Sequence, residues 1–267
     1  MSDYVVAIPT YKRYNEVTKK TLPTLKKGGV SKDKIHVFVA NKTEEKLYRE
    51  KMDPNTYGKI VVGLKGITNQ RIFISKYFPE GSCVVSLDDD VEKLQKLKGS
   101  NFKISKKKTA KKSKSNNKLV DIKNVDKFFR DAFSLLKKEG LNLWGVYPVN
   151  NPFFMDSKVT KDLRFIIGVV HGYINRHDSS LYPSKTLKGK EDYHQSILFY
   201  LKDGWIIRFN NVSFKTKFLA PGGLGKDRFE MYKKAQKFLV NKYPKMVRPK
   251  FRPDGTPEVQ LIANPDL

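Results

Sequence analysis

The sequence predicts an α/β protein with a mixed, mainly parallel central sheet flanked by helices. Over residues 4–87, short runs of β-branched and apolar residues alternate with segments of helical periodicity. This alternation is typical of parallel sheets, because crossover helices join their strands. The chain has 267 residues and a hydrophobic content of 39%, which suits either one large α/β domain or a domain with a small appendage, with a substantial core.

Four strands and three helices are expected in residues 4–87. A proline, a capping residue or a charged stretch bounds each apolar run, and all three end regular structure. Pro23 is expected to bend or end the first helix, and Thr43 to cap the second. The expected strands are 4–8, 35–40, 60–62 and 82–87, and the expected helices are 15–25, 44–52 and 67–78.

A lysine-rich segment then breaks the alternation. Residues 98–118 contain nine lysines and no acidic residue, so a low-complexity, mobile loop is expected there. Asn124 is the expected cap of a helix that Gly140 ends. The second half is expected to hold strands at 143–149, 165–174 and 205–214, helices at 191–201 and 227–242, a glycine-rich loop at 221–225 and an extended tail at 243–267.

These elements predict one domain over residues 1–225, with the basic helix and the tail of residues 226–267 packed on it. In open α/β sheets, ligands bind beyond the carboxyl ends of the strands. The residues that directly follow the strands are therefore the first candidates for a binding site. They are residues 9–13, Asn41 and the aspartates at 88–90.

The charge of the chain favours a polyanionic partner. The net charge is +26, which suits nucleic acid or an acidic membrane surface; a surface that is basic without a specific partner is the alternative.

Cys83 is the single cysteine, so no intrachain disulfide forms and a reducing compartment is expected. No secretory signal or membrane-spanning stretch is expected, so the predicted location is intracellular and cytoplasmic.

The strongest chemical signal is the run Asp88-Asp89-Asp90 at the end of the fourth expected strand. Three adjacent carboxylates repel one another unless a cation binds them, and a divalent metal prefers oxygen ligands. In an extended chain Asp88 and Asp90 point to the same side, so these two are the expected metal ligands. A solvated acidic turn, paired with lysines, is the alternative.

A second pair of acids, Glu191 and Asp192, stands where a loop becomes a helix. A carboxylate at this position would act as a general base if it faces a cleft. Ordinary stabilisation of the helix N-terminus by acids is the alternative.

Taken in order, four motifs resemble those of the GT-A-fold glycosyltransferases that use nucleotide sugars. Residues 7–13 resemble the first strand of that family, which holds the nucleotide, and residues 67–71 resemble the segment that contacts it. Residues 88–90 match the DxD motif, whose carboxylates bind a divalent metal and the sugar nucleotide. Residues 191–192 match the ED motif, in which one carboxylate deprotonates the acceptor hydroxyl. The resemblance covers roughly residues 4–225.

The resemblance implies a Rossmann-like nucleotide-binding half, an acceptor half, a UDP-sugar donor and Mn²⁺ or Mg²⁺ as cofactor. Asp192, rather than Glu191, would be the base of a single inverting displacement. Lys217, Gly222 and Gly223 would belong to a diphosphate or acceptor loop. The expected nucleotide-sugar-binding residues are Pro9, Thr10, Tyr11, Arg13, Asn41, Asn69, Arg71, Asp88 and Asp89.

The sequence departs from the family pattern in one respect. Many GT-A enzymes supply a further metal ligand, often histidine, after the strand that follows the ED helix, but residues 205–218 contain no histidine. His171 and His194 lie elsewhere, and histidines in such positions are more often core or surface residues than ligands.

The basic charge and residues 214–223 also resemble the viral and phage TET/JBP-associated glycosyltransferases. That resemblance implies transfer of a sugar to a hydroxymethylated pyrimidine in DNA, such as 5-hydroxymethylcytosine. The lysine-rich segment would then contact DNA phosphates without reading the bases. The alternatives are a glycan, lipid or protein acceptor, a metal-dependent nuclease, and a non-catalytic DNA-binding protein. The lysines expected to contact DNA are Lys106, Lys107, Lys108, Lys111 and Lys112.

Overall fold

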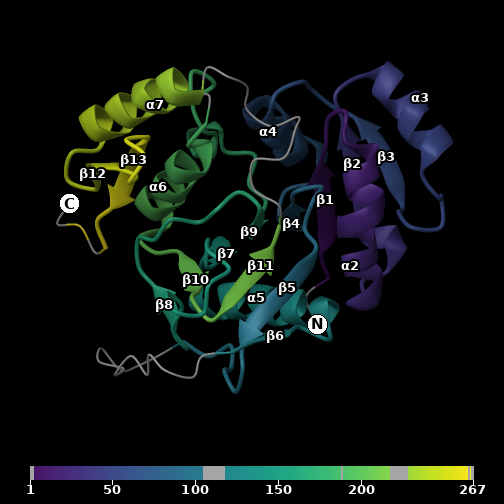
Figure 1. The fold of residues 1–267 in the computed structure, drawn as a ribbon, viewed down its shortest axis with the longest axis horizontal. Helices are drawn as coiled ribbons and strands as arrows, with labels where there is room; N and C mark the ends of the chain where they lie inside the picture. The colour runs from purple at the N-terminus through teal and green to yellow at the C-terminus, as the bar shows by residue number, and fades with distance from the viewer. Residues whose placement is uncertain (1–2, 105–117, 188, 217–227, 264, 266–267) are drawn as a thin grey trace.

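The computed structural model describes residues 3–104, 118–187, 189–216, 228–263 and 265. An eight-stranded sheet forms the centre of the fold (Figure 1). Its strands are β1 (Val5–Pro9), β2 (Ile35–Val39), β3 (Lys59–Val62), β4 (Cys83–Leu87), β7 (Leu143–Val146), β8 (Val159–Lys161), β9 (Val170–Ile174) and β10 (Ile207–Phe209). They lie in the order β3-β2-β1-β4-β9-β7-β10-β8.

Six of these strands run in the same direction. Strands β3, β2, β1 and β4 pair in parallel, and β10 pairs in parallel with β7. Only β9 and β8 are reversed, since β9 is antiparallel to β4 and β7, and β8 is antiparallel to β10. The predicted fold class, a mixed and mainly parallel sheet, is therefore confirmed.

Helices cover both faces of the sheet. They are α1 (Tyr14–Glu16), α2 (Leu22–Lys27), α3 (Lys42–Lys51), α4 (Ile67–Tyr77), α5 (Val125–Glu139), α6 (Glu191–Asp203) and α7 (Arg228–Lys242). Successive side chains of a strand point to opposite faces. Val6 and Ile8 accordingly join the core formed with α2, α3 and α5, whereas Ala7 joins the core formed with α4 and α6. A strand covered on both sides needs an almost continuous apolar run, and that is the pattern in β1.

The first helices differ from the prediction in two respects: the first does not end at Pro23, and Thr43 does not cap the next one. The helical run continues past Pro23 to Lys27, because a π-helical turn at Val17–Thr21 shifts the backbone hydrogen bonding just before the proline. Asn41, not Thr43, caps α3: its side chain accepts a hydrogen bond from the backbone N–H of Glu44.

The expected loop at 98–118 is flanked by strands that were not expected. Strand β5 (Lys93–Leu97) pairs with β6 (Leu119–Asp121) on one side and with β11 (Val212–Lys215) on the other, in a separate antiparallel sheet ordered β11-β5-β6. The backbone of Lys98 still pairs with that of Lys118. The lysines expected to contact DNA, at 106–108, 111 and 112, lie outside the described residues.

The C-terminal tail forms a hairpin rather than a single extended segment. Strands β12 (Val247–Phe251) and β13 (Pro257–Leu261) pair antiparallel, and Val247 and Val259 join the core beside α6 and α7. Gly255, with φ of 78°, allows the tight turn between them. The Asp-Gly dipeptide between two alternating runs is a recognised hairpin signal, and it was missed. Figure 1 shows α7 and this hairpin at one end of the molecule and α3 at the other.

The order of the strands places a binding edge between β1 and β4. The chain adds β2 and β3 on one side of β1 and then crosses to the other side to form β4. Ligands in α/β proteins bind at such a change of direction, beyond the carboxyl ends of the strands. No helix in the described part of the chain is long and apolar enough to cross a bilayer.

Candidate active site

The three aspartates form a turn directly after β4. The backbone N–H of Asp88 donates to the carbonyl of Val169 at 3.0 Å, and the Thr21 hydroxyl donates to the carbonyl of Asp88 at 2.8 Å. The same hydroxyl accepts from the N–H of Val91 at 2.9 Å. Because residues 89 and 90 turn, the expected alternation of side chains along an extended strand does not hold.

Arg13 joins two of the aspartates. Its guanidinium lies 3.0 Å from a carboxylate oxygen of Asp89 and 2.8 Å from one of Asp90. The Thr10 hydroxyl donates to the other oxygen of Asp89 at 2.7 Å. The hydroxyl of Tyr48 lies 2.8 Å from that of Thr10 and accepts from the N–H of Arg13 at 3.0 Å. The end of β1 and the acid turn are therefore one hydrogen-bonded unit.

Arg71, in the second turn of α4, joins the acid turn to the ED pair. It pairs with Glu191 at 2.8 Å, lies 3.5 Å from Asp88, and donates to the carbonyl of Gly168 at 3.0 Å. The N–H of Gly168 donates to the Asp192 carboxylate at 3.2 Å. A side chain at Gly168 would collide with the guanidinium, so glycine allows this close approach. The ED pair and the acid turn thus lie on either side of one arginine.

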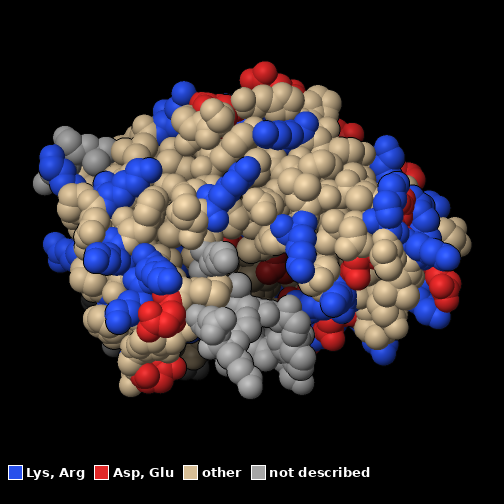
Figure 2. Space-filling model, turned by 90° about the horizontal axis from the view of Figure 1, so that it is seen from above, with Lys and Arg blue, Asp and Glu red and all other residues tan. Residues whose placement is uncertain are grey.

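The carboxylates of the site are not equally accessible. The side chains of Asp89 and Asp90 are 5% and 12% exposed, whereas that of Asp88 is 31% exposed. Asp89 is enclosed by Thr10 and Arg13, which gives it a structural role in this arrangement. Figure 2 shows a hollow with acidic side chains in its depth and Lys and Arg side chains around it.

Burial perturbs the acids on both sides of Arg71. Desolvation raises the pKa of Asp88 to about 7, with Arg71 opposing the change, and raises the pKa of Asp89 to about 6 against the effect of Arg13. Desolvation and the nearby Glu191 charge raise the pKa of Asp192 to about 7. Although Asp88 is partly accessible, protein atoms surround its carboxylate closely enough for desolvation to dominate. Several carboxyl groups with raised pKa values at one edge of a sheet are typical of functional sites.

The other residues expected to bind the nucleotide sugar lie nearby without joining this network. Pro9 ends β1, and the Tyr11 ring has the ammonium groups of Lys12 and Lys65 each 5.4 Å from its centre. Asn41 uses its side chain to cap α3. Asn69 donates to the carbonyl of Lys65 at 3.2 Å. The expected loop residues Lys217, Gly222 and Gly223 lie outside the described residues.

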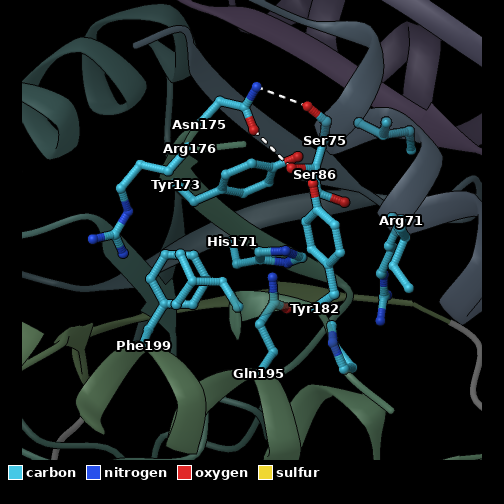
Figure 3. A pocket seen from close by; sticks show the side chains of 14 residues that line it. Arg71, Ser75, Ser86, His171, Tyr173, Asn175, Arg176, Tyr182, Gln195 and Phe199 are labelled. Carbon is cyan, nitrogen blue, oxygen red and sulfur yellow. Dashed lines mark hydrogen bonds between the residues drawn. The ribbon is translucent and has the colours of Figure 1, made fainter. Parts of the chain in front are cut away.

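His171 and Arg71 both line a small chamber. The chamber has a volume of about 30 Å³, and Figure 3 shows the His171 ring among Ser86, Tyr182 and Gln195. The Nδ1 atom of His171 lies 3.2 Å from the carbonyl of Gly168, and burial lowers the pKa of this histidine to about 3. His171 is therefore neutral at physiological pH and supports the Gly168 loop from behind.

His194 also has structural partners. Its Nε2 atom lies 2.9 Å from the hydroxyl of Tyr243, and its Nδ1 accepts from the N–H of Ser184 at 3.0 Å. It ties α6 to the segment after α7. Within the described residues, no group of three or more His, Cys, Asp and Glu side chains is arranged to hold a metal ion.

Sequence reasoning missed several residues that shape the site. Tyr48 and Thr21 position Arg13 and Asp88, and the Thr216 hydroxyl donates to the carbonyl of Asp90 at 3.1 Å. These hydroxyls carry no motif, so the sequence offers no signal for them. Gly168 was open to detection, because a glycine inside an apolar strand-like run marks a close backbone approach.

Solved structures resemble this arrangement of strands and helices. Residues 1–349 of TarS from S. aureus match with a TM-score of 0.52 and 17% identity, over 90% of this chain and 66% of that one. The fold is of the GT-A type. The mannosyltransferase PcManGT from Pyrobaculum calidifontis, solved with GDP-Man and Mn²⁺, matches with a TM-score of 0.51 and 11% identity, over 90% of this chain and 64% of that one.

These similarities establish the GT-A-type fold alone, because both identities are low. The chain spans less than two thirds of the length of either protein. No protein-family model matches the sequence, and a comparison with curated proteins finds no significant match.

Proposed function

We propose that the protein is a glycosyltransferase that transfers a sugar from a nucleotide-diphosphate sugar, with UDP as the nucleotide. One observation carries the proposal: Arg71 joins the acid turn after β4 to the ED pair at the start of α6. A donor diphosphate and an acceptor hydroxyl would then meet across this arginine. The GT-A-type fold supports the proposal, and the similar mannosyltransferase was solved with GDP-Man and Mn²⁺.

The acid turn would hold a divalent cation through two carboxylates, because the described residues offer no group of three or more ligands there. Three acids face two arginines there, and burial keeps the pKa of Asp88 near 7, so negative charge at this turn lacks full compensation. Carboxylate oxygens suit Mn²⁺ and Mg²⁺. Asp88, the most exposed of the three aspartates, and Asp90, which is less enclosed than Asp89, would hold the metal. A bound metal neutralises charge on the leaving diphosphate.

Side chains of the protein would position the aspartates and contact the donor. Arg13 and Arg71 hold the aspartates in place and contribute positive charge beside the diphosphate. Thr10 and Tyr11, at the end of β1, would contact the base or the ribose of the donor. A polar network that is already hydrogen-bonded needs little reorganisation during the reaction.

Asp192 would act as the general base. Glu191 is neutralised by Arg71 at 2.8 Å, whereas among the described residues the Asp192 carboxylate accepts only from the backbone N–H groups of Gly168 and Tyr193. A carboxylate with a pKa near 7 accepts a proton effectively at neutral pH. The acceptor O–H would lose its proton to Asp192 as the oxygen bonds the anomeric carbon and the diphosphate leaves. A single displacement inverts the anomeric centre, and retention, seen by NMR of the product, would exclude this mechanism.

For the acceptor we propose a 5-hydroxymethylpyrimidine in DNA, such as 5-hydroxymethylcytosine. The net charge of +26 supports a polyanionic acceptor. A hydroxymethyl group on a base supplies the primary hydroxyl that Asp192 would deprotonate. A base within a duplex must be flipped out or approached from the major groove.

The test is an assay of purified protein with Mn²⁺, a panel of nucleotide sugars, and DNA that contains 5-hydroxymethylcytosine or 5-hydroxymethyluracil. Mass spectrometry of the digested nucleosides detects a transferred sugar. We expect a sugar mass on one modified base, lost in Asp88→Asn and Asp192→Asn but kept in Asp131→Asn, an exchange on the outer surface of α5. Donor hydrolysis without base modification would move the acceptor to a glycan, lipid or protein. Failure to turn over any donor would reject the proposed function.

A further inference from the structure

A groove of about 340 Å³ lies beside the acid turn, between α2 and the strands β5 and β6. It starts at Glu92, two residues after Asp90, and runs along α2 to the start of α5. Figure 1 shows these elements next to one another on one side of the molecule. A molecule bound in this groove would therefore lie against the surface that leads to the proposed reaction centre.

Hydrogen bonds between neighbouring elements hold the walls of the groove. The Thr24 hydroxyl donates to the carbonyl of Glu92 at 2.7 Å, which ties α2 to the segment before β5. The carbonyl of Gly28 accepts from the N–H of Val125 at 2.8 Å, which ties the end of α2 to the start of α5. Because its walls are fixed in this way, the groove exists without a ligand, as is usual for binding pockets.

The rim of the groove is positively charged. Five lysines and two acids line it, and two of the lysines are neutralised: Lys20 pairs with Glu16 at 2.6 Å and with Glu92 at 3.5 Å, and Lys93 pairs with Asp121 at 2.9 Å. The other three are exposed and form no ion pair with any described residue. They are Lys19, Lys27 and Lys123. The groove therefore carries three ammonium groups whose charge is available to a ligand.

The floor of the groove is apolar and recessed. Leu94 and Val125, which are both 2% exposed, form it together with Pro23 and Ile122. A membrane-binding surface projects its apolar side chains outward, whereas these lie below the lysines. The volume falls in the range of about 300–1,000 Å³ of pockets for small organic groups. Lysine side chains around an apolar recess are suited to bind a nucleic-acid strand, in which anionic phosphates alternate with flat organic bases.

We propose that this groove binds a strand of nucleic acid, with phosphates on Lys19, Lys27 and Lys123 and one nucleotide against the apolar floor. The role of this groove rests on the proposed function. A strand bound here would place its neighbouring nucleotides near Asp88. None of the described lining residues is aromatic, so the bases are not stacked and the binding is independent of sequence.

The test compares two triple variants that remove the same charge. In one, Lys19, Lys27 and Lys123 are changed to Gln; in the matched control, Lys46→Gln, Lys138→Gln and Lys237→Gln change exposed lysines on α3, α5 and α7. Fluorescence anisotropy measures the affinity of the full chain for a labelled oligo-dT strand over a range of KCl concentrations. The slope of log K against log salt should fall by about 2 in the groove variant, since each lost phosphate contact removes about 0.7.

The control variant should keep a slope close to that of the unmodified protein. An equal fall in both variants would overturn the proposal and assign binding to overall charge. A groove variant that loses affinity for phosphatidylserine vesicles but keeps its DNA affinity would overturn it in favour of a membrane. Donor hydrolysis by the unmodified protein is assayed in parallel to separate the two proposals. If the donor is hydrolysed but the salt slope of the groove variant does not change, only the groove proposal is rejected. If the salt slope falls but no donor is hydrolysed, only the glycosyltransferase activity is rejected.

Discussion

The ammonium group of Lys190 is ion-paired with the carboxylate of Glu258, and this pair joins the start of α6 to the C-terminal hairpin. Lys190 has a φ of 61°, a left-handed conformation that is uncommon outside glycine. Its side chain is only 3% exposed, and its ammonium group lies 4.4 Å from the centre of the Tyr232 ring. The next residues are Glu191 and Asp192, so α7 and the hairpin hold the strained entry to the helix that carries both acids.

We expect Glu258→Gln to destabilise the protein, because it leaves the buried ammonium of Lys190 without its counter-charge. Removing one partner of a buried ion pair costs about 3 kcal/mol or more. Urea denaturation should show this loss in the free energy of unfolding, together with lower transferase activity. The double variant Lys190→Met with Glu258→Gln should recover much of the stability, since the buried ammonium is gone and only the half-exposed Arg252, which also pairs with Glu258, loses a partner. Equal losses in the single and double variants would show that the ion pair itself matters little.

Transferase activity should depend on the ionisation of Asp192. A general base works only when deprotonated, and the pKa of Asp192 is raised to about 7, so kcat should fall as the pH drops through that value. The measurement is kcat against pH at saturating donor, acceptor and metal. A rate that stays level from pH 8 to well below 6 would assign the proton transfer to another group.

The raised pKa of Asp192 should make stability fall as the pH rises, whereas the catalytic rate should rise. A carboxyl whose pKa is higher in the folded state binds a proton more tightly there, so its contribution to stability is present at low pH and is lost as the pH rises through the folded pKa. Asp192→Asn, which removes the buried charge, should therefore raise the melting temperature more at pH 8 than at pH 5. A uniform change at both values would mean that Asp192 titrates normally.

Arg71→Lys should be far from conservative. The guanidinium contacts Glu191, Asp88 and the carbonyl of Gly168 at once, and a lysine ammonium does not reproduce this planar set of donors. We expect kcat/KM to fall by about 100-fold, the scale seen when a preorganised electrostatic contact is removed. Arg49→Lys, which alters an exposed pair with Glu45 on α3, is the matched control and should keep full activity. Comparable activity in both variants would show that Arg71 has no role in the transfer reaction.

Tyr48→Phe tests the hydroxyl that joins Thr10 to Arg13. Its loss leaves the N–H of Arg13 without this acceptor, and an unsatisfied buried group costs about 1–3 kcal/mol. The loosened Arg13 should also raise the KM for the donor more than it lowers kcat. Tyr57→Phe is the control, because Tyr57 is similarly buried and no hydrogen bond to a described residue involves its hydroxyl. Thermal melts and donor kinetics of both variants decide the point.

Much of the fold follows from local patterns. Apolar runs and helical periods predicted the main strands of the sheet and most of the helices, because both depend on residues close together in the sequence. The short strands β5 and β6 escaped prediction because they carry charged and polar residues beside apolar ones. β5 is stabilised by pairing with β11, which is remote in sequence, and β6 by pairing with β5 across residues 98–118.

The sequence by itself determined the order of the main strands and helices, and it placed Asp88 and its neighbours after an apolar strand and Glu191 and Asp192 at a helix start. Only the tertiary structure decided which cation meets which acid. Arg71 and Glu191 are 120 positions apart, and Lys190 and Glu258 are 68 apart. In a chain with 53 Lys and Arg residues, no local pattern selects these partners. The central sheet brings Arg71 and Glu191 to one edge, and the C-terminal hairpin brings Glu258 to Lys190; burial then favours the pairs that compensate charge.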